Sequence, residues 1–202
     1  MRPILLANVL VVGVLVLGGP MACAQEAQHS APRFQVTSSD LAVTYNAERS
    51  QVTPGGSDFW LQGGSIDGAF TFFHGLGFAA NVTGDHASGI APGVGLNEVA
   101  MMAGPRYTFR LGSKSRSKLF VESLAGGVRG SDSVFPKSTG LDSRASAFSY
   151  QVGGGLDISI SKHLAIRAIE ADYVRTYLPN NGTDTQPHLR LAIGVTYHSQ
   201  RH

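Results

Sequence analysis

One stretch of the sequence decides the fold: Phe148-Ser149-Tyr150-Gln151-Val152-Gly153-Gly154-Gly155-Leu156-Asp157-Ile158-Ser159-Ile160. Its even positions are apolar apart from one glycine, and its odd positions are polar or glycine. Successive side chains of a strand point to opposite faces, so the stretch predicts a strand with one apolar and one polar face. A soluble sandwich can contain such a strand. The length favours a membrane strand, because about 9–11 tilted residues cross a bilayer, and so does the aromatic residue at its rim.

Eight segments of the chain fit this description. They are Asp40–Ala47, Asp58–Phe72, Leu76–Thr83, Glu98–Arg110, Leu119–Arg129, Phe148–Ile160, Leu164–Thr176 and His188–His198. Short connections, at residues 73–75, 111–118 and 161–163, alternate with longer ones at 48–57, 84–97, 130–147 and 177–187. Short turns on one side and long loops on the other are typical of outer-membrane barrels. We therefore predict an all-β, eight-stranded antiparallel up-and-down transmembrane barrel over residues 38–198, with a tail over 199–202.

A soluble lipocalin-type barrel is the alternative, and it would bury its apolar face inside. Aromatic residues favour the membrane barrel, because they fall at two levels that match the two membrane surfaces. We expect a loop-side girdle of Tyr45, Trp60, Phe148, Tyr150, Tyr173 and Tyr177, and a turn-side girdle of Phe70, Phe72, Tyr107, Phe109 and Tyr197.

The chain begins with the features of a cleavable export signal. A basic start is followed by an apolar run from Ile4 to Leu17 and by the cleavage pattern Ala22-Cys23-Ala24. The run is shorter than the roughly 18–20 residues of a spanning helix, and Pro20 argues against a lipoprotein signal centred on Cys23. We expect a signal peptide over residues 1–24, cleaved at Ala22 and Ala24, and a flexible periplasmic lead-in over residues 25–37.

Composition excludes several functions. A formal net charge of +2, with 15% charged residues and no basic run, gives no footprint for binding nucleic acid. Cleavage removes the single cysteine, so disulfides do not stabilise the mature domain. The histidines show no metal-ligand spacing, and no glycine-rich stretch fits a phosphate loop. We therefore expect no cofactor, no metal site and no nucleic-acid partner.

A series of segments along the chain resembles the small outer-membrane β-barrel domain family of the OmpA/OmpX type. The segments are Gly104-Pro105-Arg106-Tyr107-Thr108-Phe109, Phe120 to Gly127, Gly153-Gly154-Gly155-Leu156-Asp157, Ala165-Ile166-Arg167, Asp172-Tyr173 and Leu189-Arg190-Leu191. The resemblance implies a closed barrel in the cell outer membrane, contacts with outer-membrane lipid and with the barrel-assembly machinery, and no particular activity. The chain departs from the family at its end, where five residues follow Tyr197 instead of an aromatic terminus.

Charged residues on the polar face are expected in the lumen: Asp67, Glu98, Arg106, Glu122, Asp157, Arg167, Asp172 and Arg190. Eight strands leave room only for side chains, so these charges must be paired or solvated. Counting from the turns places Arg106 level with Glu122, and Asp157 level with Arg167. We favour a structural lumen of ion pairs, in a barrel with a structural or surface-interaction role whose loop ligand is unknown. A narrow or gated ion channel is the alternative, and a barrel enzyme acting on lipid A is a less favoured one.

Two further features are a His-x-Ser sequence and an odd spacing between two charged residues of one strand. His86-Ala87-Ser88 is similar to the His-x-Ser arrangement of lipid A deacylases, but it falls in a predicted loop and is followed by Gly89, so we predict no catalytic residues. Arg167 and Asp172 are both expected inside, yet their odd spacing puts them on opposite faces of a regular strand. An extra residue around Ala168-Ile169-Glu170 corrects this, so we predict a β-bulge there. A regular strand with Arg167 snorkelling to the interface is the alternative.

Overall fold

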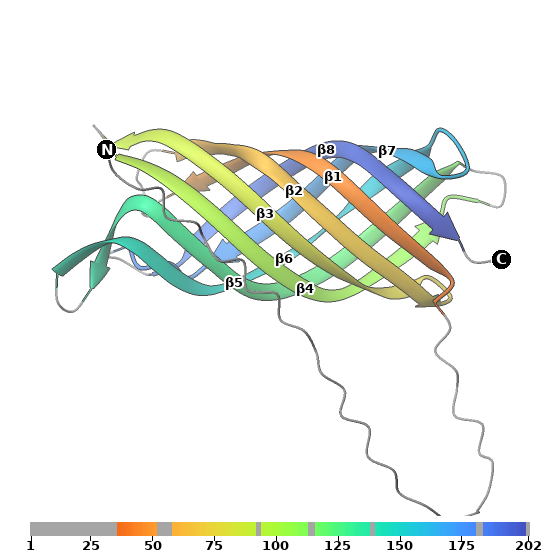
Figure 1. Cartoon of the computed structure of the whole chain (residues 1–202), viewed down its shortest axis with the longest axis horizontal. Helices are drawn as coiled ribbons and strands as arrows, with labels where there is room; N and C mark the ends of the chain where they lie inside the picture. Colours follow the sequence, from red (N-terminus) through yellow and green to blue (C-terminus); the bar gives the residue numbers. More distant parts are fainter. Residues whose placement is uncertain are drawn as a thin grey trace, which may run out of the picture. The chain divides into compact units, whose positions relative to one another are not determined.

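A computed structural model describes residues 36–51, 58–91, 94–112, 116–137, 140–180 and 184–200. These residues form a closed barrel in which each strand pairs with its neighbours in the chain and the first pairs with the last (Figure 1). The strands are β1 (Ser38–Gln51), β2 (Asp58–Phe73), β3 (Leu76–Ala91), β4 (Val94–Arg110), β5 (Ser117–Lys137), β6 (Gly140–Ser159), β7 (Leu164–Thr176) and β8 (Gln186–Gln200), all antiparallel. The predicted eight-stranded antiparallel barrel is confirmed. No helix in the described ranges is long and apolar enough to cross a membrane.

The two ends of the barrel differ. The short turns at residues 74–75 and 160–163 lie at the end where β1 begins and β8 finishes, since Ser38 pairs with Gln200. We call this the turn end, and the opposite end the loop end. The β5–β6 hairpin projects beyond the other strands at the loop end, on the left of Figure 1.

The strands extend further toward the loop end than the sequence predicts. Two of the expected loops, 84–97 and 130–147, consist largely of strand residues that lengthen β3, β4, β5 and β6. These extensions lack regular apolar alternation, which is why the sequence does not reveal them. Ser199 and Gln200 of the expected tail belong to β8. The predicted signal peptide with Ala22 and Ala24, most of the predicted lead-in, and the last two residues lie outside the described residues.

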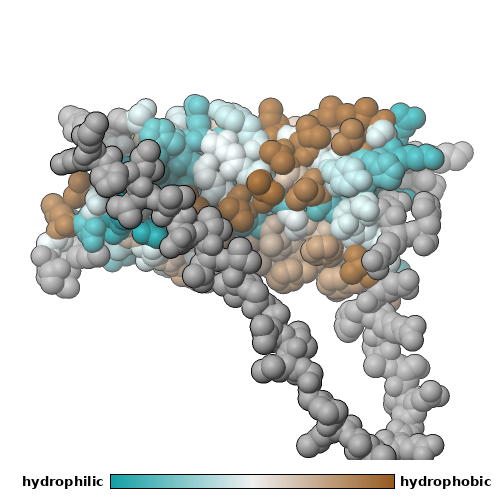
Figure 2. Space-filling view, in the orientation of Figure 1, coloured by the Kyte–Doolittle hydropathy of each residue, from teal (hydrophilic) through white to brown (hydrophobic). Residues whose placement is uncertain are grey.

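The outer face of the barrel is apolar and the lumen is polar. Each strand places an exposed apolar side chain outside: Leu41, Ile66, Val82, Met101, Val121, Val152, Ile166 and Ile193, between 45% and 62% exposed. In Figure 2, brown residues gather over the middle and the turn-side part of the visible face, and teal ones lie toward the loop end and also at the edge of the turn end. A lipocalin-type barrel would show the reverse arrangement. This face matches a hydrocarbon environment.

Aromatic residues lie near both ends of the outer face. On the loop side, Tyr45, Trp60, Phe148, Tyr173 and Tyr177 are exposed, and on the turn side Phe70, Tyr107, Phe109 and Tyr197 are exposed. Tyr150 and Phe72 are only partly exposed. A register shift between Thr71 and Phe73 displaces the end of β2, so Phe73, at 65% exposure, takes the outward position expected of Phe72.

The predicted bulge in β7 is confirmed. Asp157 pairs with Arg167 and Leu156 with Ile169, so Ala168 is an extra residue on the β7 side of the β6–β7 ladder. Ala168 and Ile169 are both exposed outside, whereas Arg167 and Asp172 are both buried inside. The bulge thus keeps both charges away from lipid.

Candidate functional site

All eight charged residues expected in the lumen have buried side chains, none more than 8% exposed. They come from β2, β4, β5, β6, β7 and β8. Seven of them gather in the middle of the lumen, and Glu98 lies apart, nearer the loop end. The barrel interior is the part of the protein where polar chemistry is concentrated.

Arg167 is the centre of the first group. Its Nε atom is 3.0 Å from Asp157 Oδ1, and one terminal nitrogen is 2.8 Å from Glu170 Oε2 and 3.6 Å from Asp67 Oδ2. Three carboxylates therefore surround one fully buried guanidinium. Sequence reasoning missed Glu170, although the same bulge that explains Arg167 and Asp172 also turns Glu170 inward.

Phe120 contacts both this group and a second one. The Arg106 guanidinium carbon lies 4.2 Å from the Phe120 ring centroid, and that of Arg167 lies 4.5 Å from it. Two cations on one aromatic ring gain cation–π attraction in a site shielded from water. Arg106 is also bonded to Glu122, with Nε 2.6 Å from Oε2, as the register of β4 and β5 predicts. Gly155 makes room for the ring, because a Cβ atom there would lie 2.7 Å from Phe120 Cζ.

Arg190 links the two groups across the lumen. It donates hydrogen bonds to Asp172 Oδ2 at 3.0 Å, to Thr83 Oγ1 at 3.1 Å and to the side-chain oxygen of Gln151. Gln151 in turn donates to Glu122 Oε1 at 3.1 Å. One guanidinium therefore joins β3, β6, β7 and β8.

The contacts form one continuous network, which we call the lumen network. From Arg190 it runs through Thr83 to Asn81 and Asp67, and from Asp67 through Ser65 to Thr44 and Asn46. Its members come from all eight strands: Thr44, Asn46, Ser65, Asp67, Asn81, Thr83, Arg106, Glu122, Gln151, Asp157, Arg167, Glu170, Asp172 and Arg190. It contains three arginines and five carboxylates. The side chains cross-link the wall from inside.

Glu98 belongs to a separate group at the loop end. It lies near Glu48 of β1 and His188 of β8, and one ligand atom of each lies within 4.8 Å of the others. His188 Nδ1 is 2.5 Å from Glu48 Oε1, and its Nε2 is 3.1 Å from Thr176 Oγ1. Sequence reasoning missed Glu48 and His188, because both lie at strand ends that it assigned to a loop or left as isolated residues. Their positions on the inward face of their strands would have indicated them.

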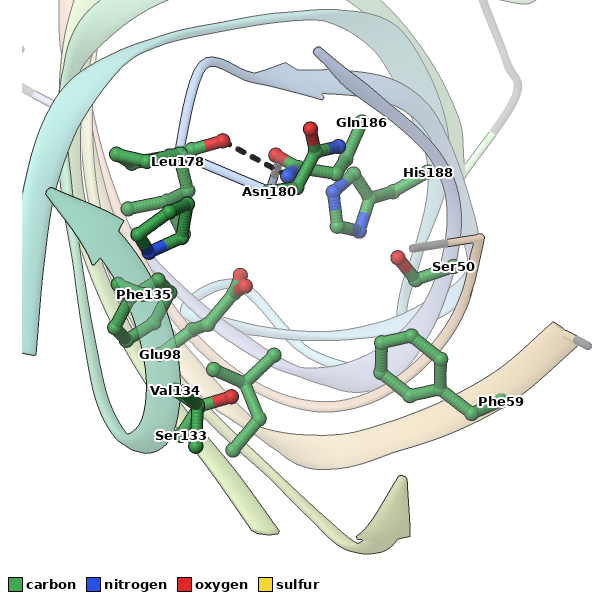
Figure 3. Close-up of a pocket in the computed structure, with 13 residues that line it drawn as sticks. Ser50, Phe59, Glu98, Ser133, Val134, Phe135, Leu178, Asn180, Gln186 and His188 are labelled. Atoms are coloured by element: carbon green, nitrogen blue, oxygen red, sulfur yellow. Dashed lines mark hydrogen bonds between the residues drawn. The ribbon is translucent and has the colours of Figure 1, made fainter. Parts of the chain in front are cut away.

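A cavity of about 120 Å³ adjoins this group. Its lining combines Glu98 and His188 with apolar side chains, among them Phe59, Phe135 and Leu178 (Figure 3). Phe135 and Leu178 belong to a buried apolar cluster at the loop end. A register shift in the β5–β6 ladder between Ser131 and Phe135 accompanies the inward turn of Phe135. The loop end of the lumen is thus capped by apolar side chains over a polar floor.

The structure corrects the position of His86-Ala87-Ser88. These residues lie in β3 and not in a loop, with His86 and Ser88 exposed and Ala87 buried. His86 Nδ1 is 2.5 Å from Asn97 Oδ1, and Asn97 donates to Asp132. The histidine is therefore engaged with neighbouring strands.

Comparisons with known proteins agree on the fold. No protein-family model and no curated protein matches the chain. Among solved structures, it is similar to Neisserial surface protein A, with 16% identity over 79% of this chain and 96% of that one, and a TM-score of 0.58. It is also similar to Ail, the attachment invasion locus protein of Yersinia pestis, in complex with the heparin analogue sucrose octasulfate. That match has 16% identity over 82% of this chain and 100% of that one, and a TM-score of 0.53.

The chain is a small eight-stranded barrel of the outer-membrane type. The apolar outer face of this barrel suits a membrane, and its fold is the one predicted for an outer-membrane barrel. Sequence identities of this size show similarity of fold alone.

Proposed function

We propose that this outer-membrane barrel has a structural or surface-interaction role and that its lumen is closed by ion-paired side chains. The observation that carries the proposal is the lumen network, which reaches every strand and bridges the lumen through Arg190. A conducting pore needs a continuous wet path. Here paired charged side chains fill the lumen, where they stiffen the wall and leave no such path.

The loop end supports the surface role. β5 and β6, with 21 and 20 residues, form the longest hairpin of the barrel and carry it beyond the loop-side girdle. Val134 and Leu141 on this hairpin are 53% and 72% exposed. Exposed apolar side chains beyond the membrane are typical of contact surfaces. Ail was solved with a heparin analogue, so a barrel of this fold has been seen with a bound ligand.

The proposal includes no catalytic activity. Among the described residues, Ser88 has no hydrogen bond with His86, so the pair lacks the contact by which a base activates a nucleophile. The partners in this proposal are the lipid around the apolar face, the machinery that assembles the barrel, and a surface ligand at the loop end. Nucleic acid is not among them.

Two measurements test the proposal. Membrane fractionation and gel mobility come first: the protein is expected in the outer membrane and is expected to migrate faster unheated than boiled, because a closed barrel resists detergent. Single-channel recording in planar bilayers comes second, and no steady conductance is expected. Steady conductance that disappears in a variant with altered lumen charges would replace the structural role with a channel. Recovery in the soluble periplasm would refute both.

A further inference from the structure

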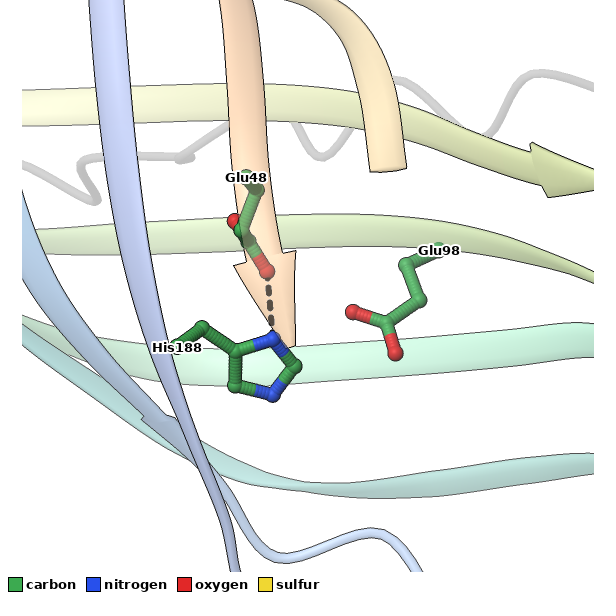
Figure 4. A group of neighbouring side chains, drawn as sticks. All are labelled: Glu48, Glu98 and His188. Atoms are coloured by element: carbon green, nitrogen blue, oxygen red, sulfur yellow. Dashed lines mark ion pairs between the residues drawn. The ribbon is translucent and has the colours of Figure 1, made fainter. Parts of the chain in front are cut away.

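We propose that Glu48, Glu98 and His188 form a binding site for a divalent transition-metal ion of the Zn²⁺ class, which we call the loop-end site. The three side chains come from β1, β4 and β8, far apart in the sequence, and their ligand atoms lie within 4.8 Å of one another (Figure 4). All three are buried. Such an arrangement can close around one ion with small side-chain movements.

The ligand types decide the class of ion. Two carboxylates and one imidazole form a mixed oxygen and nitrogen set, which suits Zn²⁺ and its neighbours in the first transition row. Ca²⁺ and Mg²⁺ favour sites built of oxygen alone. Two carboxylates with a neutral imidazole also carry the charge that a divalent cation balances. A ring nitrogen of His188 that becomes a ligand gives up its proton to water.

An independent observation comes from Glu98. Its side chain is buried, with 8% exposure of the residue, and among the described residues it has neither a hydrogen bond nor an ion pair. Figure 4 shows its carboxylate directed toward His188. A buried carboxylate without a partner is costly, and a cation removes that cost. Asp85, which pairs with Glu98 in the β3–β4 register, also has a buried oxygen without a hydrogen-bond donor.

The other acidic group of the lumen makes a useful contrast. Glu122, Glu170 and Asp172 also lie within 4.8 Å of one another, but each of them is bonded to an arginine, namely Arg106, Arg167 and Arg190. Each of these three carboxylates therefore already has an arginine partner. At the loop-end site no arginine or lysine of the described chain forms an ion pair with Glu48 or Glu98. The carboxylates that lack an arginine partner are therefore those at the loop end.

The site also adjoins the loop-end cavity. Glu98 and His188 both line the cavity at the loop end, together with the polar side chains of Ser50 and Gln186 (Figure 3). An ion entering there meets the ligands without passing the lumen network. Phe135 and Leu178 shield the cavity, so a bound ion would lie in a partly dry environment that strengthens its attraction to the carboxylates.

The test is metal binding by the full barrel, folded in detergent micelles and carrying no histidine tag. Equilibrium dialysis against Zn²⁺, followed by elemental analysis, is expected to give one tightly bound ion per chain. Glu98→Gln and His188→Gln should each weaken binding at least about tenfold, as the loss of a group that a metal site depends on does. His74→Gln is the matched control, because His74 is exposed at the turn end, and it should bind as the wild type does.

Several results would overturn the proposal. They are no bound Zn²⁺ in the wild type, unchanged binding in both loop-end variants, or an equal loss in His74→Gln. Gel mobility of the unheated samples checks that each variant folds. If the variants fail that check, X-ray absorption of the Zn²⁺-loaded wild type decides: one imidazole nitrogen with carboxylate oxygens is expected, and a shell without imidazole refutes the site.

Discussion

Arg190 in β8 donates a hydrogen bond to Thr83 in β3, with 3.1 Å between Nη1 and Oγ1. These strands are not neighbours in the barrel, since β1 and β2 lie between them on one side and β4 to β7 on the other. The contact therefore crosses the lumen, and the same guanidinium also holds Asp172. Much of the lumen network depends on this one side chain.

Replacing Arg190 by methionine should destabilise the barrel strongly. The methionine fills similar space but leaves the buried Asp172 without its cation, and breaking a buried ion pair in this way costs about 3–5 kcal/mol. The free energy of unfolding in urea, measured in lipid vesicles, checks the value. Arg129→Met is the control, because Arg129 is exposed on the outer side of β5 and should show a much smaller change. Equal effects of the two substitutions would mean that the lumen network contributes little.

Gly155→Ala should also lower stability. The added methyl group would lie 2.7 Å from the Phe120 ring and 2.7 Å from the carbonyl oxygen of Ile169, so the ring or the strand must shift. Overpacking of this kind costs about 1–3 kcal/mol. Gly68→Ala, where nothing lies within 4 Å of the new atom, serves as the comparison in the same unfolding experiment. A neutral Gly155→Ala would show that Phe120 has room to move.

Deletion of Ala168 tests the bulge. Without this residue Arg167 and Asp172 are four positions apart, so a regular strand keeps Arg167, Glu170 and Asp172 in the lumen. We therefore expect the deletion variant to keep the fast-migrating folded band in refolding gels. Ala168→Val keeps the bulge and should refold as well. Loss of the folded band in the deletion variant alone would contradict the assignment of Ala168 as the extra residue.

Arginine at Val152 or Ile193 should be costly, because both positions face outward, at 50% and 57% exposure, in the apolar band. A charge there costs about 2–4 kcal/mol near mid-bilayer. Ile193→Val is the conservative control in the unfolding assay. Gln151→Arg is not a mild counterpart, since Gln151 is fully buried between Arg190 and Glu122 and has no room for a second guanidinium. Wild-type stability of Val152→Arg would contradict the outward assignment.

The alternation of residues predicts the barrel because lipid imposes it on every spanning strand. The outward positions of Leu41, Val43 and Tyr45 follow from the local sequence alone, whatever strands lie beside them. The parity conflict between Arg167 and Asp172 predicts even the bulge. Strand length beyond the membrane is different: around Ala87 or Ser131, lipid no longer selects the outward residues, so the apolar alternation fades while the strand pairing continues.

Only part of the candidate site can be predicted from the sequence, for a related reason. Pairs across one turn, such as Arg106 with Glu122, follow from counting residues. Contacts across the lumen, such as Arg190 with Thr83, depend on how the barrel closes and on how far strands are staggered. The loop-end site joins β1, β4 and β8, and no local pattern brings Glu48, Glu98 and His188 together.

The place of Arg190 in the last strand has a consequence for biogenesis. A chain with only its first seven strands in place contains Asp172, Gln151 and Thr83. Arg190, which donates hydrogen bonds to all three, lies 107 residues after Thr83 in the sequence and belongs to the last strand. Until then Asp172 lacks the arginine that pairs with it. Closure of the seam between β1 and β8 therefore coincides with the pairing of Asp172, and a product truncated before β8 keeps an acidic side chain without its cation.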